Sequence, residues 1–260
     1  MTDALDLSLL ASRLGGLRLA REIRVMEEVS STNDVVADFG RQGAAEGLVV
    51  FAERQTRGRG RLGRVWESSH GQGLWFSLLL RPAFSVALWP RMTTWAAVAL
   101  AEALEVFVSC RAMIKWPNDI YLNGRKAVGI LTESVAARDG FAVLGIGVNV
   151  NQPAFAPPLD ATATSLRIET GTVLDRVSVA EAVLKRLDET YALVEPEFQE
   201  IIRRASGRNF LEGRRVQLEH GMEKVRGIAG GLDENGALLV FREDGGAFAA
   251  NSGEVTLAAW

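Results

Sequence analysis

The feature that most constrains the fold is a change of pattern at Gly213. Before it, apolar runs typical of strands alternate with segments of helical periodicity. After it come only short strand-like runs, separated by turn sequences such as DENG and EDGG. A chain of 260 residues has room for a medium domain and a small one. We therefore predict two units, residues 1–210 and 211–260. So short a second module buries little surface alone, so we expect it to pack against the first.

The larger unit is predicted to be a mixed sheet flanked by helices. Continuous apolar runs are typical of buried strands, and apolar residues at helical spacing over 90–108 indicate a core helix. A second helical stripe, over 177–206, is interrupted near Pro196. The other predicted elements are strands at 23–29, 47–53, 73–82, 111–116 and 141–151, a short helix at 35–43, and four strands within 214–258.

A hairpin is predicted where Asn-Gly, at 123–124, joins two apolar runs. It places Lys126 near the start of the returning strand. Because side chains alternate along a strand, we expect Lys126 to share a face with Val128 and Ile130. Such a lysine either lies at a strand end with its ammonium reaching water, or is held inward for chemistry. The residues alone leave both open, although Asp119 on the other strand could orient it.

Composition limits the classes of function. The net charge is −3, so the chain lacks the overall basic field of a dedicated nucleic-acid binder. The single cysteine, Cys110, forbids an internal disulfide, and with only His70 and His220 a zinc site is not expected. The first residues carry aspartates where a signal peptide needs positive charge, and no apolar run is long enough to span a membrane. We expect a cytoplasmic protein.

A loop rich in arginine and glycine follows the predicted strand at 47–53. Residues 58–63, GRGRLG, fit the spacing G-x-G-x-x-G, but neither a helix nor an acidic residue about 20 positions on follows, which argues against a dinucleotide site. The loop resembles no P-loop either. Its glycines permit close backbone approach and its guanidinium groups suit phosphate or carboxylate, so we expect an anion to order it. On the loop alone, a solvated basic segment or a nucleic-acid contact stays equally open.

Several motifs together resemble a known family. GRGRLGRVW, KWPND, GRKAVGIL and GIGVNVN, in this order and spacing, are similar to the biotin protein ligases, as are STN at Ser31 and TSL at Thr164. The resemblance implies an α+β fold. Its mixed β-sheet flanked by helices is that of the biotin/lipoate ligase catalytic domain, which is class II aminoacyl-tRNA synthetase-like, and a small C-terminal SH3-like barrel follows. Because STN begins so early, we expect the monofunctional class, without an N-terminal DNA-binding domain.

The resemblance also implies a reaction. Biotin and ATP give biotinyl-5′-AMP, and the biotinyl group then passes to a lysine of a biotin carboxyl carrier protein of acetyl-CoA carboxylase or another biotin-dependent carboxylase. Mg²⁺ arrives with ATP, held mainly by the phosphates, so no protein metal site is expected. No DNA and no membrane are expected as partners, and a homodimer is left open. The alternatives are a lipoate–protein ligase, which shares the architecture, and a nucleic-acid-binding or regulatory protein.

The site residues carry over by position. The resemblance gives catalytic roles to Lys126, Arg61 and Asp119. Its biotin contacts fall on Ser31, Thr32, Asn33, Gln55, Arg59, Gly60, Arg61, Lys126 and Gly129. Its ATP contacts fall on Arg61, Arg64, Trp66, Asn118, Lys126, Asn149 and Asn151. For Ser31 to Asn33 the residues equally predict a plain helix cap. Residues 68–73, SSHGQG, depart from the Pro-rich stretch of relatives, so the shape of the nucleotide edge is left open there.

Overall fold

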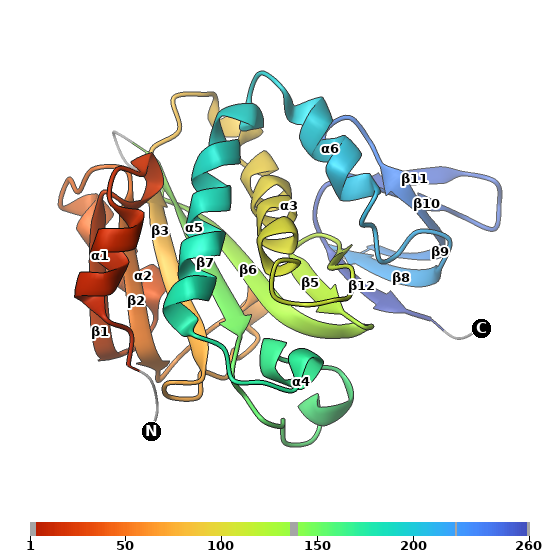
Figure 1. The fold of residues 1–260 in the computed structure, drawn as a ribbon. Helices are drawn as coiled ribbons and strands as arrows, with labels where there is room; N and C mark the ends of the chain where they lie inside the picture. The colour runs from red at the N-terminus through yellow and green to blue at the C-terminus, as the bar shows by residue number, and fades with distance from the viewer. Residues whose placement is uncertain (1–3, 136–139, 222, 259–260) are drawn as a thin grey trace.

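The computed structural model describes residues 4–135, 140–221 and 223–258. Figure 1 shows the larger unit built on one sheet and the small C-terminal unit beside it. The sheet has seven strands in the order β1-β2-β3-β7-β6-β5-β4. Only β1 and β2 pair in parallel, and all other neighbours are antiparallel, so the predicted mixed sheet is confirmed. The strands are β1 (Glu22–Val29), β2 (Leu48–Gln55), β3 (Gly73–Leu80), β4 (Met113–Lys115), β5 (Asp119–Leu122), β6 (Arg125–Val135) and β7 (Phe141–Asn149).

Helices cover the two faces of this sheet unequally (Figure 1). We call the face under α1, α3 and α5 the helix face, and the opposite face, which carries α2, the α2 face. The helix α6 lies between α3 and the small unit. The helices are α1 (Leu7–Leu14), α2 (Thr32–Arg41), α3 (Arg91–Leu104), α4 (Leu166–Thr170), α5 (Arg176–Tyr191) and α6 (Phe198–Ser206). Short 3-10 turns are η1 (Arg18–Ala20), η2 (Arg61–Gly63), η3 (Val86–Leu88), η4 (Leu159–Ala161) and η5 (Ala192–Val194).

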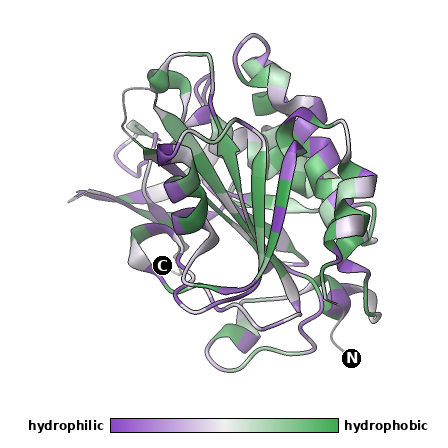
Figure 2. Ribbon diagram, turned by 90° about the vertical axis from the view of Figure 1, so that its left-hand side faces the viewer, coloured by the Kyte–Doolittle hydropathy of each residue, from purple (hydrophilic) through white to green (hydrophobic). Residues whose placement is uncertain are grey.

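The core lies between the helix face and its helices, where the central strands are strongly hydrophobic (Figure 2). Every residue of β3 and β7 is buried, as the continuous apolar runs predict. Alternate residues Leu144 and Ile146 of β7 pack into this core beside Trp95 of α3. The period of two along each strand therefore sends one set of side chains to the core and frees the other set for the α2 face.

The small unit is a five-stranded antiparallel sheet in the order β11-β10-β9-β8-β12. Its core contains Val216, Leu218 and Val240, and it packs on the larger unit through Trp116, whose indole donates to the Gly236 carbonyl at 3.0 Å. The expected packing against the larger unit is therefore observed. The strands are β8 (Arg215–His220), β9 (Glu223–Leu232), β10 (Leu238–Phe241), β11 (Ala247–Ala250) and β12 (Glu254–Leu257). The division at residue 210 stays a prediction.

Two helices are absent from the sequence prediction. Helix α4 has 5 residues, too few to repeat a helical period, whereas α1 has 8 and carries buried Leu10 and Leu14 at helical spacing, a signal that the prediction did not use. Their cap signals are nevertheless present. Asp6 accepts from the Leu9 amide at 3.0 Å, and Ser165 accepts from the Ile168 amide at 3.1 Å.

Candidate functional site

A cavity of about 430 Å³ opens on the α2 face, beneath residues 57–66, which we call the arginine loop. Residues 253–255 of the small unit close one side of it. The structure brings nearly all predicted site residues to its lining: Ser31, Thr32, Asn33, Gln55, Arg59, Gly60, Arg61, Arg64, Trp66, Asn118, Asp119, Lys126, Gly129 and Asn149. Asn151 does not line it, because its side-chain amide is bonded to both backbone groups of Leu174 at 2.8 and 2.9 Å.

Glycines form the floor of the cavity. A Cβ atom on Gly129 or on Gly147 would lie 2.6 Å from the Trp66 ring, and one on Gly145 would lie 2.1 Å from Asn33 Oδ1. Only a residue without a side chain admits such contacts. The Trp66 indole thus rests directly on β6 and β7, and its buried Nε1 has no hydrogen-bond partner among the described residues. A buried donor without a partner is uncommon in folded proteins.

One end of the cavity is lined by neutral polar groups with fixed orientations. The side-chain carbonyl of Gln55 accepts from the backbone N–H of Thr32 at 2.9 Å. The Ser77 hydroxyl lies 2.5 Å from Asn33 Oδ1, to which it donates, and 2.7 Å from the Thr32 hydroxyl. Ser31 occupies the N-cap position of α2, but its side chain makes no capping hydrogen bond. A plain capping role therefore does not account for this buried hydroxyl, which is free to meet a ligand.

The arginine loop is held by acidic partners. Arg59 forms a two-pronged pair with Asp34 at 2.7 and 2.9 Å and also contacts Glu133, bonds that raise the pKa of Arg59 and lower that of Asp34. Arg61 donates to the Gly253 carbonyl at 3.1 Å, and burial lowers its pKa. Arg64 pairs with Glu254. These contacts offset the repulsion expected among the arginines and tie the loop to the small unit.

Lys126 lies on the α2 face, so its predicted sharing of a face with Val128 and Ile130 is wrong. The reason is a β-bulge. Tyr121 of β5 pairs with Lys126, but the next residue, Ile120, pairs with Val128, so Ala127 is extra. The bulge shifts the alternation by one residue. Val128 and Ile130 then join the core on the helix face, while Lys126 lines the cavity.

In the cavity, the Lys126 ammonium lies between a carboxylate and an aromatic ring. Its Nζ lies 2.8 Å from Asp119 Oδ1 and 5.2 Å from the centroid of the Trp66 ring. Its side chain is 30% exposed, which distinguishes it from a strand-end lysine extended into water. The inward alternative left open by the sequence is therefore the observed one. Asp119 orients the ammonium, as the hairpin suggests.

A buried carboxylate outside the cavity fixes the backbone around Lys126. The Lys126 amide donates to the Thr162 carbonyl, and its carbonyl accepts from the Thr164 amide, both at 2.8 Å. The Glu169 side chain, only 5% exposed, binds the Thr164 hydroxyl, Arg125 at 3.0 Å and, at 2.6 Å, the amide of Asn123 in the hairpin turn. Glu169 thus clamps both segments that flank the lysine.

Sequence reasoning missed Glu169, Glu254 and Lys115. Lys115 opens the KWPND motif, which was a usable signal. Glu169 and Glu254 carried none, because each meets the site from a segment distant in the chain. Among the residues that the structure describes, no group of three or more His, Cys, Asp or Glu could hold a metal ion. In the same described part of the chain, no helix has both the length and the apolar character needed to cross a membrane.

Comparisons with known proteins agree with this geometry. The Biotin/lipoate A/B protein ligase family matches residues 25–151, and the Biotin protein ligase C terminal domain matches residues 213–257. The bifunctional ligase/repressor BirA of Bacillus spizizenii is 40% identical over 177 residues, covering 66% of this chain and 54% of that protein. The chain thus spans about half the length of this relative and of its Bacillus subtilis counterpart. The biotin–[acetyl-CoA-carboxylase] ligase of Mycobacterium tuberculosis is 31% identical, covering 85% of this chain and 83% of that protein.

Solved structures give the same result over most of the chain. The biotin protein ligase from Aquifex aeolicus in complex with biotin and ATP superposes with a TM-score of 0.81 at 34% identity. This match covers 92% of this chain and 99% of that one. The predicted α+β class is therefore confirmed. Two family matches, a relative covered over 83% of its length and a shared fold all agree, and the chain belongs to the biotin protein ligase family.

Proposed function

We propose that the protein joins biotin to a lysine of a biotin carboxyl carrier protein, using ATP and passing through biotinyl-5′-AMP. The observation that carries this proposal is the cavity itself. Its neutral polar end lies along the same glycine floor as a cationic end that contains Lys126 and Arg61. The first end suits the uncharged ureido ring of biotin, and the second suits a carboxylate and a phosphate brought together. A related structure holds biotin and ATP.

In the first step, a carboxylate oxygen of biotin attacks the α-phosphorus of ATP. A carboxylate–phosphorus bond forms, the bond to the β-phosphate oxygen breaks, and pyrophosphate leaves with the electron pair. Both reactants are anions, so a fixed cation between them stabilises the transition state. We assign this role to Lys126, which Asp119 holds at 2.8 Å. We assign to Arg61 and Arg64 the contacts to phosphate oxygens, with Arg61 closing the arginine loop over the intermediate.

Binding roles follow from position. Thr32, Asn33 and Gln55 orient the ureido ring, together with Ser31, Arg59 and the backbone of Gly60. Gly129 lets the Trp66 ring rest on the floor of the cavity, which keeps the space beside that ring for biotin. Trp66 stacks on adenine, and Asn118 and Asn149 meet the nucleotide. Asn151 supports the site from outside the cavity. Its backbone N–H donates to the Gln72 carbonyl at 2.6 Å and so anchors the divergent 68–73 loop beside β7.

In the second step, the acceptor lysine's amine attacks the carbonyl carbon of the mixed anhydride. A C–N bond forms, and AMP leaves with the electrons of the broken C–O bond. The amine must lose a proton, and we assign Asp119 to orient the amine and accept that proton. Mg²⁺ enters bound to the phosphates of ATP and neutralises part of their charge there. The acceptor that we propose is a carrier domain of acetyl-CoA carboxylase or a similar enzyme, and we propose the cytoplasm as the place of the reaction.

The test is transfer of labelled biotin to a purified carrier domain. We expect labelling that requires ATP and is abolished when the carrier's target lysine is replaced by arginine. Labelled lipoate offered in parallel separates this function from that of a lipoate ligase. Transfer of lipoate with no transfer of biotin would contradict the proposal, and so would an absence of ATP-dependent labelling by a folded protein.

A further inference from the structure

Lys115 is a second lysine in the cavity, and the reaction as described leaves it without a role. It ends β4, directly opposite Asp119 in the β4–β5 register, and it lines the cavity. Its Nζ lies 5.6 Å from the centroid of the Tyr121 ring. Directly opposed residues share one face of the sheet, so Lys115 and Asp119 point to the same side.

The ammonium of Lys115 has no counter-ion of its own. Among the described residues it makes no hydrogen bond and no ion pair. The nearest carboxylate, Asp119, is taken by Lys126 at 2.8 Å. Burial lowers the pKa of Lys115, and the positive charges of Lys126 and Arg64 lower it further, while Asp119 opposes them. A partly buried cation without a partner is unfavourable, and an anionic ligand would relieve it.

The placement of Lys115 suits a longer anion than one phosphate. Lys126 is on β6 and Lys115 on β4, with β5 between them. Neighbouring strands lie about 4.8 Å apart, so the two backbones are about 10 Å apart. Arg64 supplies a third positive charge on this side, near Glu254 of the small unit. Cations distributed in this way match successive phosphates of an extended chain.

We propose that Lys115 binds the β- and γ-phosphates of ATP and stabilises the pyrophosphate that leaves in the first step. This inference rests on the proposed function. When the bond between the α-phosphorus and the bridging oxygen breaks, the electron pair moves onto that oxygen, and no proton needs to be transferred. A fixed ammonium beside the pyrophosphate stabilises this developing charge. In the second step no pyrophosphate is present, so Lys115 has no part in it.

The experiment compares the two steps in Lys115→Met, which keeps the length of the side chain and removes its charge. We expect kcat/KM for ATP in adenylation to fall on the order of 10- to 100-fold. Product inhibition by added pyrophosphate should weaken by a similar factor, because the product loses the same contact. Biotin affinity and transfer from chemically made biotinyl-5′-AMP should stay within about twofold, because neither involves the leaving group.

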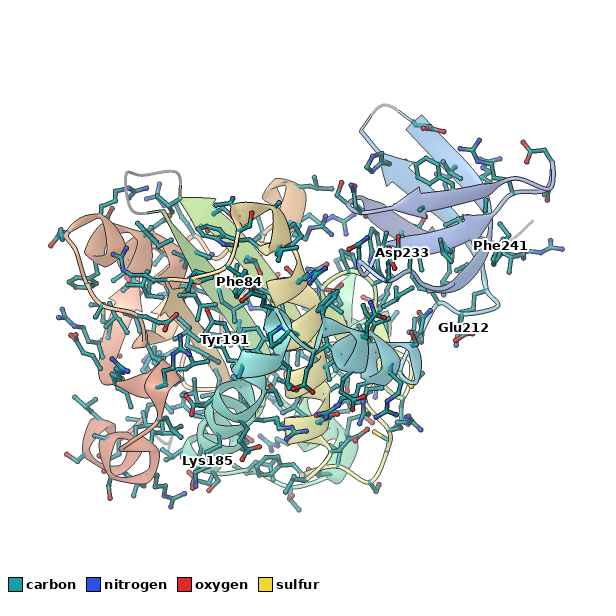
Figure 3. The ribbon with its side chains drawn as sticks, turned by 90° about the horizontal axis from the view of Figure 1, so that it is seen from above. Phe84, Lys185, Tyr191, Glu212, Asp233 and Phe241 are labelled. Carbon is teal, nitrogen blue, oxygen red and sulfur yellow. The ribbon has the colours of Figure 1, made fainter. Side chains whose placement is uncertain are left out.

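Lys185→Met is the matched control, since Lys185 lies on α5, on the helix side of the molecule (Figure 3). It should leave both steps unchanged. Lys115→Arg restores a charge and should recover much of the pyrophosphate inhibition. Unaltered ATP kinetics and pyrophosphate inhibition in Lys115→Met would overturn the inference, and so would an equal loss in both steps. If the wild-type protein itself fails to transfer biotin from biotinyl-5′-AMP, the proposed function fails instead.

Discussion

The two faces of strands β6 and β7 differ sharply although they share one backbone. On the helix face, Val128, Ile130, Leu144 and Ile146 form part of a continuous apolar core. On the α2 face, Gly129, Gly145 and Gly147 clear the floor of the cavity, and apolar residues such as Val143 pack against Val36 of α2 farther along the sheet. The first face stabilises the fold by burying apolar area, and the second holds open a space that contains charge. Stability and function are thus assigned to opposite sides of the same strands.

The largest effect is expected on the helix face. Leu144→Ala should lower the free energy of unfolding by about 2–5 kcal/mol, because it leaves a cavity in a fully packed core. Adenylation by the folded variant, assayed well below its unfolding transition, should stay near that of the wild type. Urea or thermal unfolding, measured beside the rate, checks both statements. A folded Leu144→Ala with a large loss of kcat would break the comparison.

The converse effect is expected on the α2 face. Lys126→Ala should slow adenylation by on the order of 100-fold or more, about 2.7 kcal/mol in the barrier, because a preorganised cation is lost. Thermal stability should change little, since this side chain is outside the core. Lys126→Arg should rescue poorly, because a planar fork does not reproduce a compact ammonium. Pyrophosphate release by each variant gives the rate, and adenylation by Lys126→Ala at nearly the wild-type rate would remove the lysine from the mechanism.

A smaller effect tests how far the functional face extends beyond the cavity. Glu169→Gln keeps the shape of the clamp but removes its ion pair with Arg125, and we expect adenylation to slow by roughly fivefold. Because Glu169 acts through Lys126, the same change in a Lys126→Ala background should have almost no further effect. A double-mutant cycle on the adenylation rate measures this. If the two fold-losses in adenylation rate instead multiply in the double variant, Glu169 acts independently of Lys126 and supports the fold generally.

The smallest effect concerns the small unit. Arg64 is 68% exposed and its pair with Glu254 is at the surface, so Glu254→Gln should change thermal stability by less than about 1 kcal/mol. It should loosen the arginine loop, and amide hydrogen exchange over residues 57–66 should rise slightly without ligand. Unchanged exchange in this segment would show that the pair does not hold the loop.

Much of this arrangement is predictable from sequence. The continuous runs of β2, β3 and β7 identify buried strands, and Asn123 and Gly124, with φ angles of 45° and 81°, form the predicted turn. The motifs also predict most of the residues with site roles that line the cavity, although Asn151 does not line it and Lys115 is missed. Periodicity cannot predict that Glu169 reaches the hairpin or that Glu254 reaches the arginine loop, because both contacts depend on how distant segments pack. Nor can it predict the bulge at Ala127, because a bulge breaks the alternation on which the prediction depends.

That one extra residue makes the pairing register the sensitive variable in this hairpin. If the same residues paired regularly with β5, with Ala127 taking a partner of its own, the Lys126 side chain would turn toward the hydrocarbon layer under α3. The protein would then have to bury an unpaired ammonium or unravel the hairpin, although no chemical group of the site had been altered. Deleting Ala127, in contrast, would make Lys126 and Val128 neighbours and keep them on opposite faces, so the site depends here on how the strands pair as well as on which side chains they carry.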